Sequence, residues 1–506
     1  MKRIRVYIAL ALLSLLMVAA YVGIKKYNKI NYLAEKRANE INYIDQHSIY
    51  IKDNKICNED SKELLDLLPK VEIYQPLYNV SLPKETKVNL DIKRLESSKG
   101  RAEAVLQYLG NNSKVKSLNI LDIGSSLGYM DLYFSERGHK TYGIDISENN
   151  VKISRLLAKL NQLDNVKFDV KEFNKEFVSE VDYSYDIAFI FSVLHHIVKE
   201  HGLEYAQDLM VELLDKTPLV FAELALKEEK VDFPWKEALP EDHLAVFAKC
   251  KDCQIELLGY FDTHLSNVKR PLYAVKKKSM IINGKVYGFN KLSFISYNHN
   301  SNAIDHRTRR YYAADDYIIK EVIAKYLPIK YECGNLISFY NNKDLIQNIP
   351  TARLYDWDQN GERIRFVFEK IKGNNLADII KDIDDKQKRN IVYKVISIIS
   401  SIEKNGLYYN DLRPWNFIVD FIDNGEAEVK IIDFDMTMPV AAESSLESLL
   451  WLMQQLNKGE VEVIDFAKKG MREVDLSEFG SLADIAQLII ENKVISMNEL
   501  NLRLNK

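Results

Sequence analysis

Apolar and polar residues are distributed differently in successive regions of this chain of 506 residues. An unbroken apolar run occupies 6–24. From 117 to 278, short apolar runs alternate with helical periods, which is typical of a parallel sheet with crossover helices. From 279 onward, short strands precede mostly helical periodicity. The pattern predicts an α/β domain over 71–278 and a second, bilobal α+β domain over 279–506.

The apolar run, VYIALALLSLLMVAAYVGI, carries no charge and has lysines and arginines on both sides. A helix needs about 20 apolar residues to cross a bilayer, so the run fits an uncleaved transmembrane anchor over 1–30. A secretory signal peptide is the alternative, but the run is long and no clear cleavage site follows it. A charged helical spacer is expected over 31–70, and the basic residues place the C-terminal side in the cytoplasm.

Composition narrows the possible functions. The net charge of -4 gives no basic surface for nucleic acid, and 47% hydrophobic residues are enough to fill the cores of two domains. Four cysteines are too few for a disulfide framework. Cys250 and Cys253 form one C-x-x-C pair, whereas a structural zinc site needs four ligands. We therefore expect these two cysteines to be reduced thiols.

The first domain should contain a seven-stranded Rossmann-like sheet. The last two strands are separated only by a short loop, so they should form a hairpin. The seven expected strands read LNILDI, TYGIDI, NVKFDV, YDIAFIFS, PLVFAEL, IELLGYF and PLYAVKK.

A glycine turn follows the first strand and holds Asp122, Gly124, Ser126 and Gly128. Glycines let a ligand approach the backbone, and ligands of such sheets bind outside the carboxyl ends of the strands. The turn lacks the G-x-G-x-x-G spacing that suits a pyrophosphate. Asp145 ends the next strand, where a carboxylate can accept both ribose hydroxyls. This arrangement resembles motifs I and II of class I S-adenosylmethionine (SAM)-dependent methyltransferases.

Polar residues end the other strands and are expected around the rest of the ligand. Asp169 ends the third strand and either contacts the adenine or is an ordinary solvated turn aspartate. Histidines at these ends can act as a general base or orient an acceptor oxygen near the methyl group. The residues that end the later strands are His195, His196, Glu223, Thr263 and His264.

The most specific motif of the second domain is YYNDLRPWNFIVD followed by IIDFD. Asp411 and Asn416 have the D-x-x-x-x-N spacing of a kinase catalytic loop. There the acid accepts the proton of the acceptor hydroxyl and the amide holds Mg²⁺. Asp433 follows an apolar strand, where a kinase places its other metal-binding acid. The motif predicts phosphoryl transfer from ATP.

Upstream residues complete the kinase pattern. Lys320 ends an apolar run and should pair with Glu332 on the following helix. Glu369 and Ile371, in FVFEKIKG, should form the hinge near the adenine. Tyr409-Asn410 replaces the usual His-Arg, Asp435 replaces the glycine of D-F-G, and no glycine-rich loop precedes Lys320. These departures favour a small-molecule or sugar kinase over a regulated protein kinase.

The order methyltransferase then kinase resembles the WbdD-type family of fused enzymes that terminate O-antigen polysaccharide chains. The motifs that carry the resemblance, over about 70–440, are YQPLYN, LDIGSSLGY, SVLHHI, ELALKEE, THLS with RPLY, and NDLRPWN with IDFD. In that family the kinase phosphorylates the terminal sugar of a glycan and the methyltransferase methylates that phosphate. The family reaches the membrane through a C-terminal coiled coil, whereas here an N-terminal run takes that place.

The resemblance implies further site residues and partners. Tyr74, Gln75 and Tyr78 would form a lid beside SAM, and Arg94 and Arg270 would contact the phosphate. It implies a glycan acceptor on a membrane lipid, a glycosyltransferase or polysaccharide exporter as protein partner, and a location at the bacterial inner membrane. Two alternatives remain: a kinase-like scaffold that binds a partner enzyme, and a drug-resistance phosphotransferase.

Overall fold

The structure is a computed structural model of the whole chain. It describes residues 49–50, 59–73, 75–81, 92–112, 117–229, 233–263, 268–294, 309–324, 327–422, 426–439, 441, 444–461 and 475–505. The predicted anchor lies outside these residues, as does most of the predicted spacer. Among the helices that the structure describes, none is long and apolar enough to cross a membrane.

The first domain is built on one seven-stranded mixed sheet with the order β5-β4-β3-β6-β7-β9-β8. The first five strands in chain order are parallel, and β8 and β9 are antiparallel. The predicted C-terminal hairpin is therefore confirmed. The strands are β3 (Asn119–Ile123), β4 (Lys140–Asp145), β5 (Val166–Val170), β6 (Ile187–Phe191), β7 (Leu219–Glu223), β8 (Cys253–Phe261) and β9 (Arg270–Lys277).

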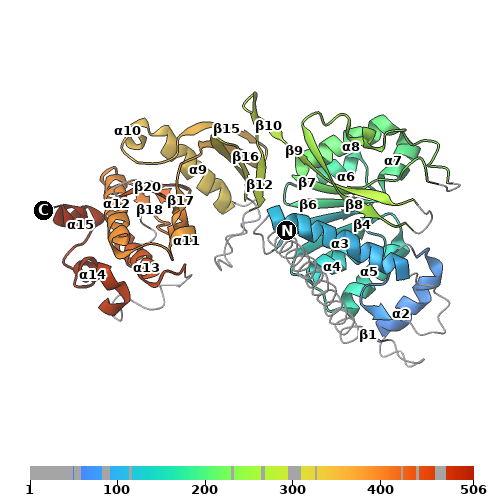
Figure 1. Cartoon of the computed structure of the whole chain (residues 1–506), viewed down its shortest axis with the longest axis horizontal. Helices are drawn as coiled ribbons and strands as arrows, with labels where there is room; N and C mark the ends of the chain where they lie inside the picture. The colour runs from blue at the N-terminus through green and yellow to red at the C-terminus, as the bar shows by residue number, and fades with distance from the viewer. Residues whose placement is uncertain are drawn as a thin grey trace, which may run out of the picture.

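Helices cover both faces of this sheet (Figure 1). The central strands β3, β6 and β7 are almost wholly buried because helices cover both faces, and their residues are therefore apolar on both sides. One buried cluster joins the sheet to α3 (Ile92–Asn112), α4 (Tyr129–Ser135) and α5 (Glu148–Leu160). A second cluster joins it to α6 (Lys175–Glu180), α7 (Leu194–His201) and α8 (Leu203–Lys216). Short helix α2 (Glu59–Leu67) packs beside α5.

The C-x-x-C pair corrects a prediction. Cys250 and Cys253 form a disulfide at the start of β8, not two reduced thiols. Its physical reason is proximity, because the turn between η2 (His243–Phe247) and β8 brings the two Cα atoms to 5.4 Å, within the range of a disulfide.

The second domain has two lobes. Its first lobe is a five-stranded antiparallel sheet, β12-β13-β14-β16-β15, packed against α9 (Leu327–Asn341) and α10 (Lys343–Ile346). The hairpin β10 (Ser279–Ile282)–β11 (Lys285–Gly288) precedes it. The strands of this sheet are β12 (Lys291–Phe294), β13 (Arg309–Ala313), β14 (Tyr317–Ile323), β15 (Leu354–Asn360) and β16 (Arg363–Glu369).

The second lobe is mainly helical. Its central helix α12 (Asp385–Lys404) begins at a capping box of Asp384 and Gln387, a strong local helix signal. Around it lie α11 (Leu376–Ile379), α13 (Ser445–Lys458), η7 (Leu476–Leu482), α14 (Ala483–Ile490) and α15 (Met497–Leu504). Two small sheets flank the motif segments. One has three strands, β17 (Asn374–Asn375), β19 (Phe417–Phe421) and β20 (Ala427–Ile431), and the other has two, β18 (Tyr408–Tyr409) and β21 (Thr437–Met438).

The first lobe of the second domain lies between the methyltransferase-like sheet and the helical lobe (Figure 1). A continuous buried cluster crosses this boundary and includes Leu118 and Ile120 on one side and Tyr312 and Ile319 on the other. Buried arginines add polar contacts. Arg310 donates to the carbonyl oxygen of Tyr185 at 2.7 Å and to that of Tyr183, both just before β6.

The boundary therefore lies at the amino end of β6, opposite the edge where a ligand of the first sheet binds. Arg363 of β16 makes a second polar contact across it, with the carboxylate of Asp215 at 3.3 Å. Because apolar and charged contacts both cross the boundary, we expect the two domains to unfold together.

Replacing Arg310 with methionine should destabilise both domains by about 3–5 kcal/mol, because the buried Glu321 loses one of its two arginine partners and two carbonyl oxygens lose a donor. Arg353→Met is the matched control. The Arg353 side chain is mostly exposed and makes a long contact of 3.9 Å with Glu369, so its loss should cost about 0–1 kcal/mol. Urea unfolding followed by circular dichroism measures both. Similar losses for the two variants would contradict a structural role for Arg310.

Two candidate active sites

The glycine turn after β3 has a backbone that few side chains tolerate. Gly124 and Gly128 have φ values of 73° and 74°, and Ser126 also has a positive φ of 52°. A Cβ atom on Gly124 would come within 2.3 Å of Val193, and one on Gly128 within 2.7 Å of Phe168. The turn therefore needs glycine at both positions, and it exposes backbone for a ligand.

Asp145 is held in a fixed orientation at the end of β4. Its carboxylate accepts from the backbone N–H of Ser126 at 2.9 Å and from that of Ser147 at 2.8 Å. The Asn150 amide donates to it at 3.2 Å. The sequence predicted Asp145 and the glycine turn as parts of one site, and the structure joins them by a direct hydrogen bond.

Asp122 lies at the floor of the turn with a second carboxyl, Asp131, beside it. Burial raises the pKa of Asp122 to about 7 and, together with the Asp122 charge, raises that of Asp131 well above its ordinary value. The pair can therefore keep a proton at neutral pH. The contact of Asp122 with the ligand stays a prediction.

Two of the three residues of the predicted lid, Gln75 and Tyr78, are described by the structure. Gln75 accepts from the backbone N–H of Tyr129, the first residue of α4, at 3.2 Å. Tyr78 packs edge-on against the Tyr129 ring and donates to Glu136. Gln75 thus reaches the glycine turn, while Tyr74 lies outside the described residues.

These residues fit SAM. The hydroxyls of Ser125 and Ser126 are buried in the turn and have no hydrogen-bond partner among the residues that the structure describes. A bound ligand with hydroxyl, amine or carboxylate groups would satisfy them. Asp145 offers a carboxylate to a ribose, and the turn provides neutral backbone instead of a phosphate cradle. Asp169, in β5, accepts from Tyr142 at 2.9 Å and pairs with Arg155, and its contact with the adenine stays a prediction.

Replacing Gly128 with alanine should lower SAM affinity at least tenfold, because the new methyl meets Phe168 and displaces the turn. Gly138 has a similar φ of 86° but open space around it, so Gly138→Ala isolates backbone strain of about 1–2 kcal/mol. Titration calorimetry with SAM should find near-normal affinity in the Gly138 variant. Equal affinity in both variants would contradict the role of the turn.

A buried charge network lies at the carboxyl edge of the sheet beyond this turn. Glu223, at the end of β7, pairs with Arg101 of α3 and accepts from the Ser192 hydroxyl at 2.6 Å. Arg270, at the start of β9, holds Glu229 through two hydrogen bonds of 2.7 and 2.9 Å. Arg270 also donates to Ser192 at 3.0 Å. Two arginines and two glutamates therefore meet around one hydroxyl.

Two neutral histidines stand beside this network. The rings of His195 and His196 lie 4.1 Å apart, and His195 packs on Trp235. Burial, together with the positive charge of Arg270, lowers the pKa of both histidines. Nδ1 of His195 is buried without a hydrogen-bond partner among the described residues. Both imidazoles are therefore neutral near pH 7. His264, the third predicted histidine, lies outside the described residues.

The kinase-type centre brings together the predicted catalytic loop. The Asn416 amide donates to the Asp411 carboxylate at 2.7 Å and to its carbonyl oxygen at 2.8 Å. Asp433 follows β20 with a φ of 63°, a strained value for a non-glycine residue and typical of functional sites. Asn416 and Asp433 offer the oxygen ligands that Mg²⁺ prefers. The predicted hinge residue Glu369 ends β16, and Ile371 follows it before α11.

The predicted pairing of Lys320 with Glu332 is wrong for this structure. Nζ of Lys320 contacts the carboxylates of Asp433 at 2.6 Å and Asp435 at 3.0 Å. Glu332 pairs instead with Arg309 of β13, which occupies the space between Glu332 and Asp435. Arg309 therefore pairs with Glu332 in place of the lysine, and Asp435 pairs with Lys320 in place of the glutamate.

An aromatic stack supports the segment that carries Asp433. Phe434 lies parallel to Phe339 of α9 with ring centroids 3.7 Å apart, and Tyr409 meets Phe434 edge-on. The Tyr409 hydroxyl donates to the carbonyl oxygens of Ile432 at 2.9 Å and Asp433 at 3.1 Å. Tyr409, which replaces the usual histidine, therefore retains a positioning contact with the metal-binding segment.

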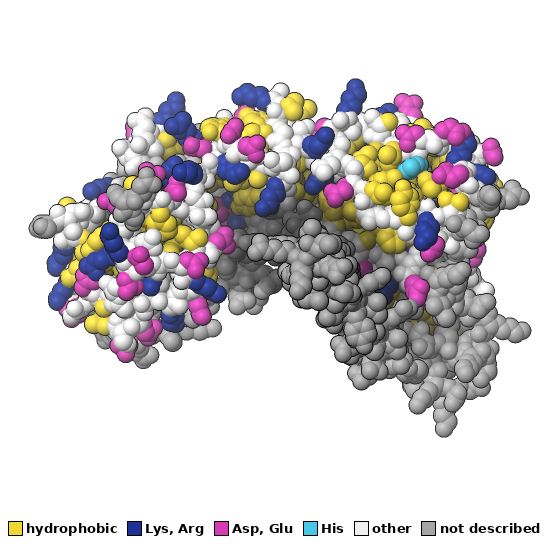
Figure 2. Space-filling model, in the orientation of Figure 1, with side chains coloured by type: hydrophobic (Ala, Val, Ile, Leu, Met, Phe, Trp, Pro, Cys, Tyr) yellow, Lys and Arg dark blue, Asp and Glu magenta, His cyan; other side chains and the backbone are white. Residues whose placement is uncertain are grey.

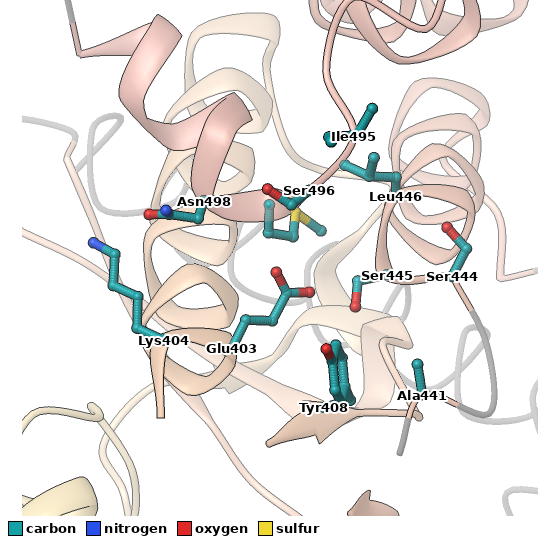
Figure 3. A pocket seen from close by; sticks show the side chains of 11 residues that line it. Glu403, Lys404, Tyr408, Ala441, Ser444, Ser445, Leu446, Ile495, Ser496 and Asn498 are labelled. Atoms are coloured by element: carbon teal, nitrogen blue, oxygen red, sulfur yellow. The ribbon is translucent and has the colours of Figure 1, made fainter. Parts of the chain in front are cut away.

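One cavity of about 370 Å³ is lined by none of the residues of the two centres. It is formed where α12 ends and where α13 and α15 begin, and none of the predicted site residues lines it (Figure 3). Glu403 and Tyr408 face it, and burial raises the pKa of Glu403.

Several residues of these centres were not predicted, among them Arg101, Ser192 and Arg309. Arg101 lies on a helix without a recognisable motif, Ser192 is a small polar residue after β6, and Arg309 lies on a strand far from the catalytic loop in sequence. The positive φ of Ser192, 58°, marks it only in three dimensions. The sequence signal nearest to Arg309 was the Asp435 departure, which requires a compensating cation.

Comparisons with known proteins agree with this division. A family model described as methyltransferase domain matches residues 114–206, and one described as protein kinase domain matches 337–453. The chain is 29% identical over 346 residues to the O-antigen chain terminator bifunctional methyltransferase/kinase WbdD of Escherichia coli, covering 66% of this chain and 47% of that protein. It is 29% identical over 174 residues to ribosomal protein L11 methyltransferase of Caldanaerobacter subterraneus subsp. tengcongensis, covering 31% of this chain and 56% of that protein.

A crystal structure of WbdD aligns with 24% identity and a TM-score of 0.38, and covers 85% of this chain and 99% of that one. The chain spans about half the length of the WbdD relatives it matches. The resemblance read from the motifs is therefore confirmed at the level of the two domains, one a methyltransferase domain and the other a kinase domain.

Proposed function

We propose that this fused methyltransferase and kinase ends the growth of a cell-surface glycan, first phosphorylating its terminal sugar with ATP and then methylating the product with SAM. The observation that carries the proposal is the pair of separate sites in one chain that is similar to WbdD over two thirds of its length. Asp411, Asn416 and Asp433 form the first site, and the glycine turn with Asp145 forms the second.

In the kinase step, Asp411 accepts the proton of the sugar hydroxyl as its oxygen attacks the γ-phosphorus and ADP leaves. Asn416 orients Asp411 through its amide and, with Asp433, would hold Mg²⁺, which neutralises phosphate charge when bound. Lys320 supplies the cation for the nucleotide phosphates. These roles require positioning and electrostatics, which a buried cluster of fixed charges provides.

In the methyl-transfer step, an oxygen of the new phosphate attacks the methyl carbon and S-adenosylhomocysteine leaves. Arg101 and Arg270 supply positive charge for an anionic acceptor, and the Ser192 hydroxyl, which accepts from Arg270 and donates to Glu223, links their two ion pairs. Their glutamate partners moderate that charge, so the acceptor oxygen keeps its nucleophilicity. A sugar hydroxyl would instead need a base, and the neutral imidazoles of His195 and His196 are the candidates at this edge of the sheet.

The proposed setting is the cytoplasmic face of a bacterial inner membrane, with 6–24 as the anchor in the lipid bilayer. Tethering would raise the effective concentration of an acceptor that grows on a membrane lipid. A glycosyltransferase or a polysaccharide exporter is the proposed protein partner. Basic and acidic side chains are interspersed on the face shown in Figure 2, which is consistent with the proposal that nucleic acid is not a partner.

Lys320 is paired with two aspartates instead of being free to bind nucleotide phosphates. This pairing supports a second candidate function, a methyltransferase whose kinase domain is a scaffold for a partner enzyme. Thermal unfolding with and without Mg-ATP separates the two. A rise in Tm that is lost in Asp433→Asn supports a working nucleotide site, whereas no rise in the wild type supports the scaffold.

Mass spectrometry of glycan termini from cells with and without the gene tests the proposal directly. We expect terminal sugars that carry a methylated phosphate only when the gene is present, and longer chains when it is deleted. Termini unchanged by the deletion would contradict chain termination.

A further inference from the structure

Lys320 has two acid partners in the kinase domain, and they come from one short segment. Its Nζ atom is 2.6 Å from Asp433 and 3.0 Å from Asp435, and the Lys320 side chain is only 5% exposed. A protein kinase has glycine at the position of Asp435. The D-F-G pattern of protein kinases therefore does not account for the second contact.

Mg²⁺ would affect the two contacts of Lys320 differently. Asp433 is the acid that would hold Mg²⁺, and a carboxylate oxygen that ligates a dication binds a lysine ammonium less strongly. Asp435 has no such competing role, because it faces Lys320 and Arg309 in a buried position. In the nucleotide-bound protein, Asp435 thus remains as the acid that the structure offers to Lys320.

Glu332 does not compete for the lysine, because Arg309 holds it. The same NH2 nitrogen of Arg309 contacts Glu332 and lies 3.2 Å from Asp435. The Asn335 amide, one turn along α9 from Glu332, donates to the Asp435 carbonyl oxygen at 2.9 Å. Arg309 and Asn335 therefore tie α9 and β13 to the segment that carries the metal-binding acid.

We propose that Asp435, not Glu332, is the positioning residue for Lys320, and that Arg309 links Asp435 to Glu332 so that the lysine, α9 and the metal-binding segment form one preassembled unit. The inference rests on the proposed kinase function. It implies that this kinase needs no movement of α9 to become competent, since α9 does not hold the lysine.

The kinetic test compares Asp435→Asn with Glu332→Gln in the full-length protein, with ATP hydrolysis to ADP as the readout. Loss of the lysine orientation should lower kcat about 10²-fold in Asp435→Asn, with a smaller change in KM for ATP. Glu332→Gln should lose at least tenfold less. Asp344→Asn, an exposed substitution on α10, is the control and should leave kcat unchanged. A merely structural role for Asp435 would lower Tm and leave kcat per folded molecule unchanged.

A second readout does not depend on activity. The Tm losses of Lys320→Met and Asp435→Asn should fall short of adding by at least about 2 °C in the double variant, because the two residues are in contact. Those of Lys320→Met and Glu332→Gln should add. Additive losses for the first pair would overturn the inference, as would equal loss of kcat in Glu332→Gln and Asp435→Asn, or full kcat in Asp435→Gly.

The two proposals fail separately. A wild-type protein that neither binds nor hydrolyses Mg-ATP would contradict the proposed kinase function. The non-additivity of the Tm losses would still decide whether Asp435 positions Lys320.

Discussion

Replacing Asp411 with asparagine is expected to lower phosphoryl transfer to the glycan by about 10²–10⁴-fold, because the acceptor hydroxyl loses its proton acceptor. The amide keeps the shape of the carboxyl, so the loop held by Asn416 should remain folded. Transfer of ³²P from ATP to isolated lipid-linked glycan measures the first step, and methyl transfer from labelled SAM measures the second.

Both labels should disappear together in Asp411→Asn, because the methyl acceptor is the phosphorylated end. Asp382→Asn, an exposed change just before α12 in the same lobe, should leave both labels unchanged. Supplying glycan that the wild-type enzyme has already phosphorylated should restore methylation in Asp411→Asn. Methylation of unphosphorylated glycan by that variant would show that the two steps are independent.

Replacing Arg270 with methionine should destabilise the methyltransferase domain by about 3–5 kcal/mol, because it leaves the carboxylate of Glu229 fully buried without its two hydrogen bonds. The same change removes a donor to Ser192, so methyl transfer should fall as well. Urea unfolding measures the first effect, and labelled SAM measures the second in the folded fraction.

Lys269 provides the matched control. It is adjacent in sequence but largely exposed and 3.6 Å from Asp262, so Lys269→Met should cost about 0–1 kcal/mol. Adding Glu229→Gln to Arg270→Met should recover part of the lost stability, since the unpaired charge is then gone. A loss below 1 kcal/mol in Arg270→Met would contradict the network.

The two-domain organisation could be predicted from local patterns. Strands β3, β6 and β7 are short apolar runs because both faces of a central parallel strand are covered, and the alternation with helices follows from the crossover connections. The hairpin β8–β9 was also predictable from a local feature, because a short loop can join only antiparallel strands. No such local signal indicated that the two domains share a buried cluster.

The sites divide in the same way. Asp411 with Asn416, and Gly124 with Gly128, are close in sequence, so their spacing alone indicates a loop with a defined chemistry. The partner of Lys320 could not be predicted, because Asp433, Asp435 and Glu332 are all possible partners and Arg309, from another strand, competes with the lysine for two of them. Burial decides that competition, since each charge must find the nearest opposite charge once water is excluded.

By itself, the sequence determined the order of the domains, the seven strands and the motifs of both centres, because these depend on residues a few positions apart. Only the tertiary structure decided that Arg101 and Arg270 meet Glu223 and Glu229, that Cys250 bonds to Cys253, and that Asp435 rather than Glu332 faces Lys320. These pairings depend on distances between groups that packing brings together. The energy of a buried charge changes steeply with such distances, so sequence spacing alone cannot rank the possible partners.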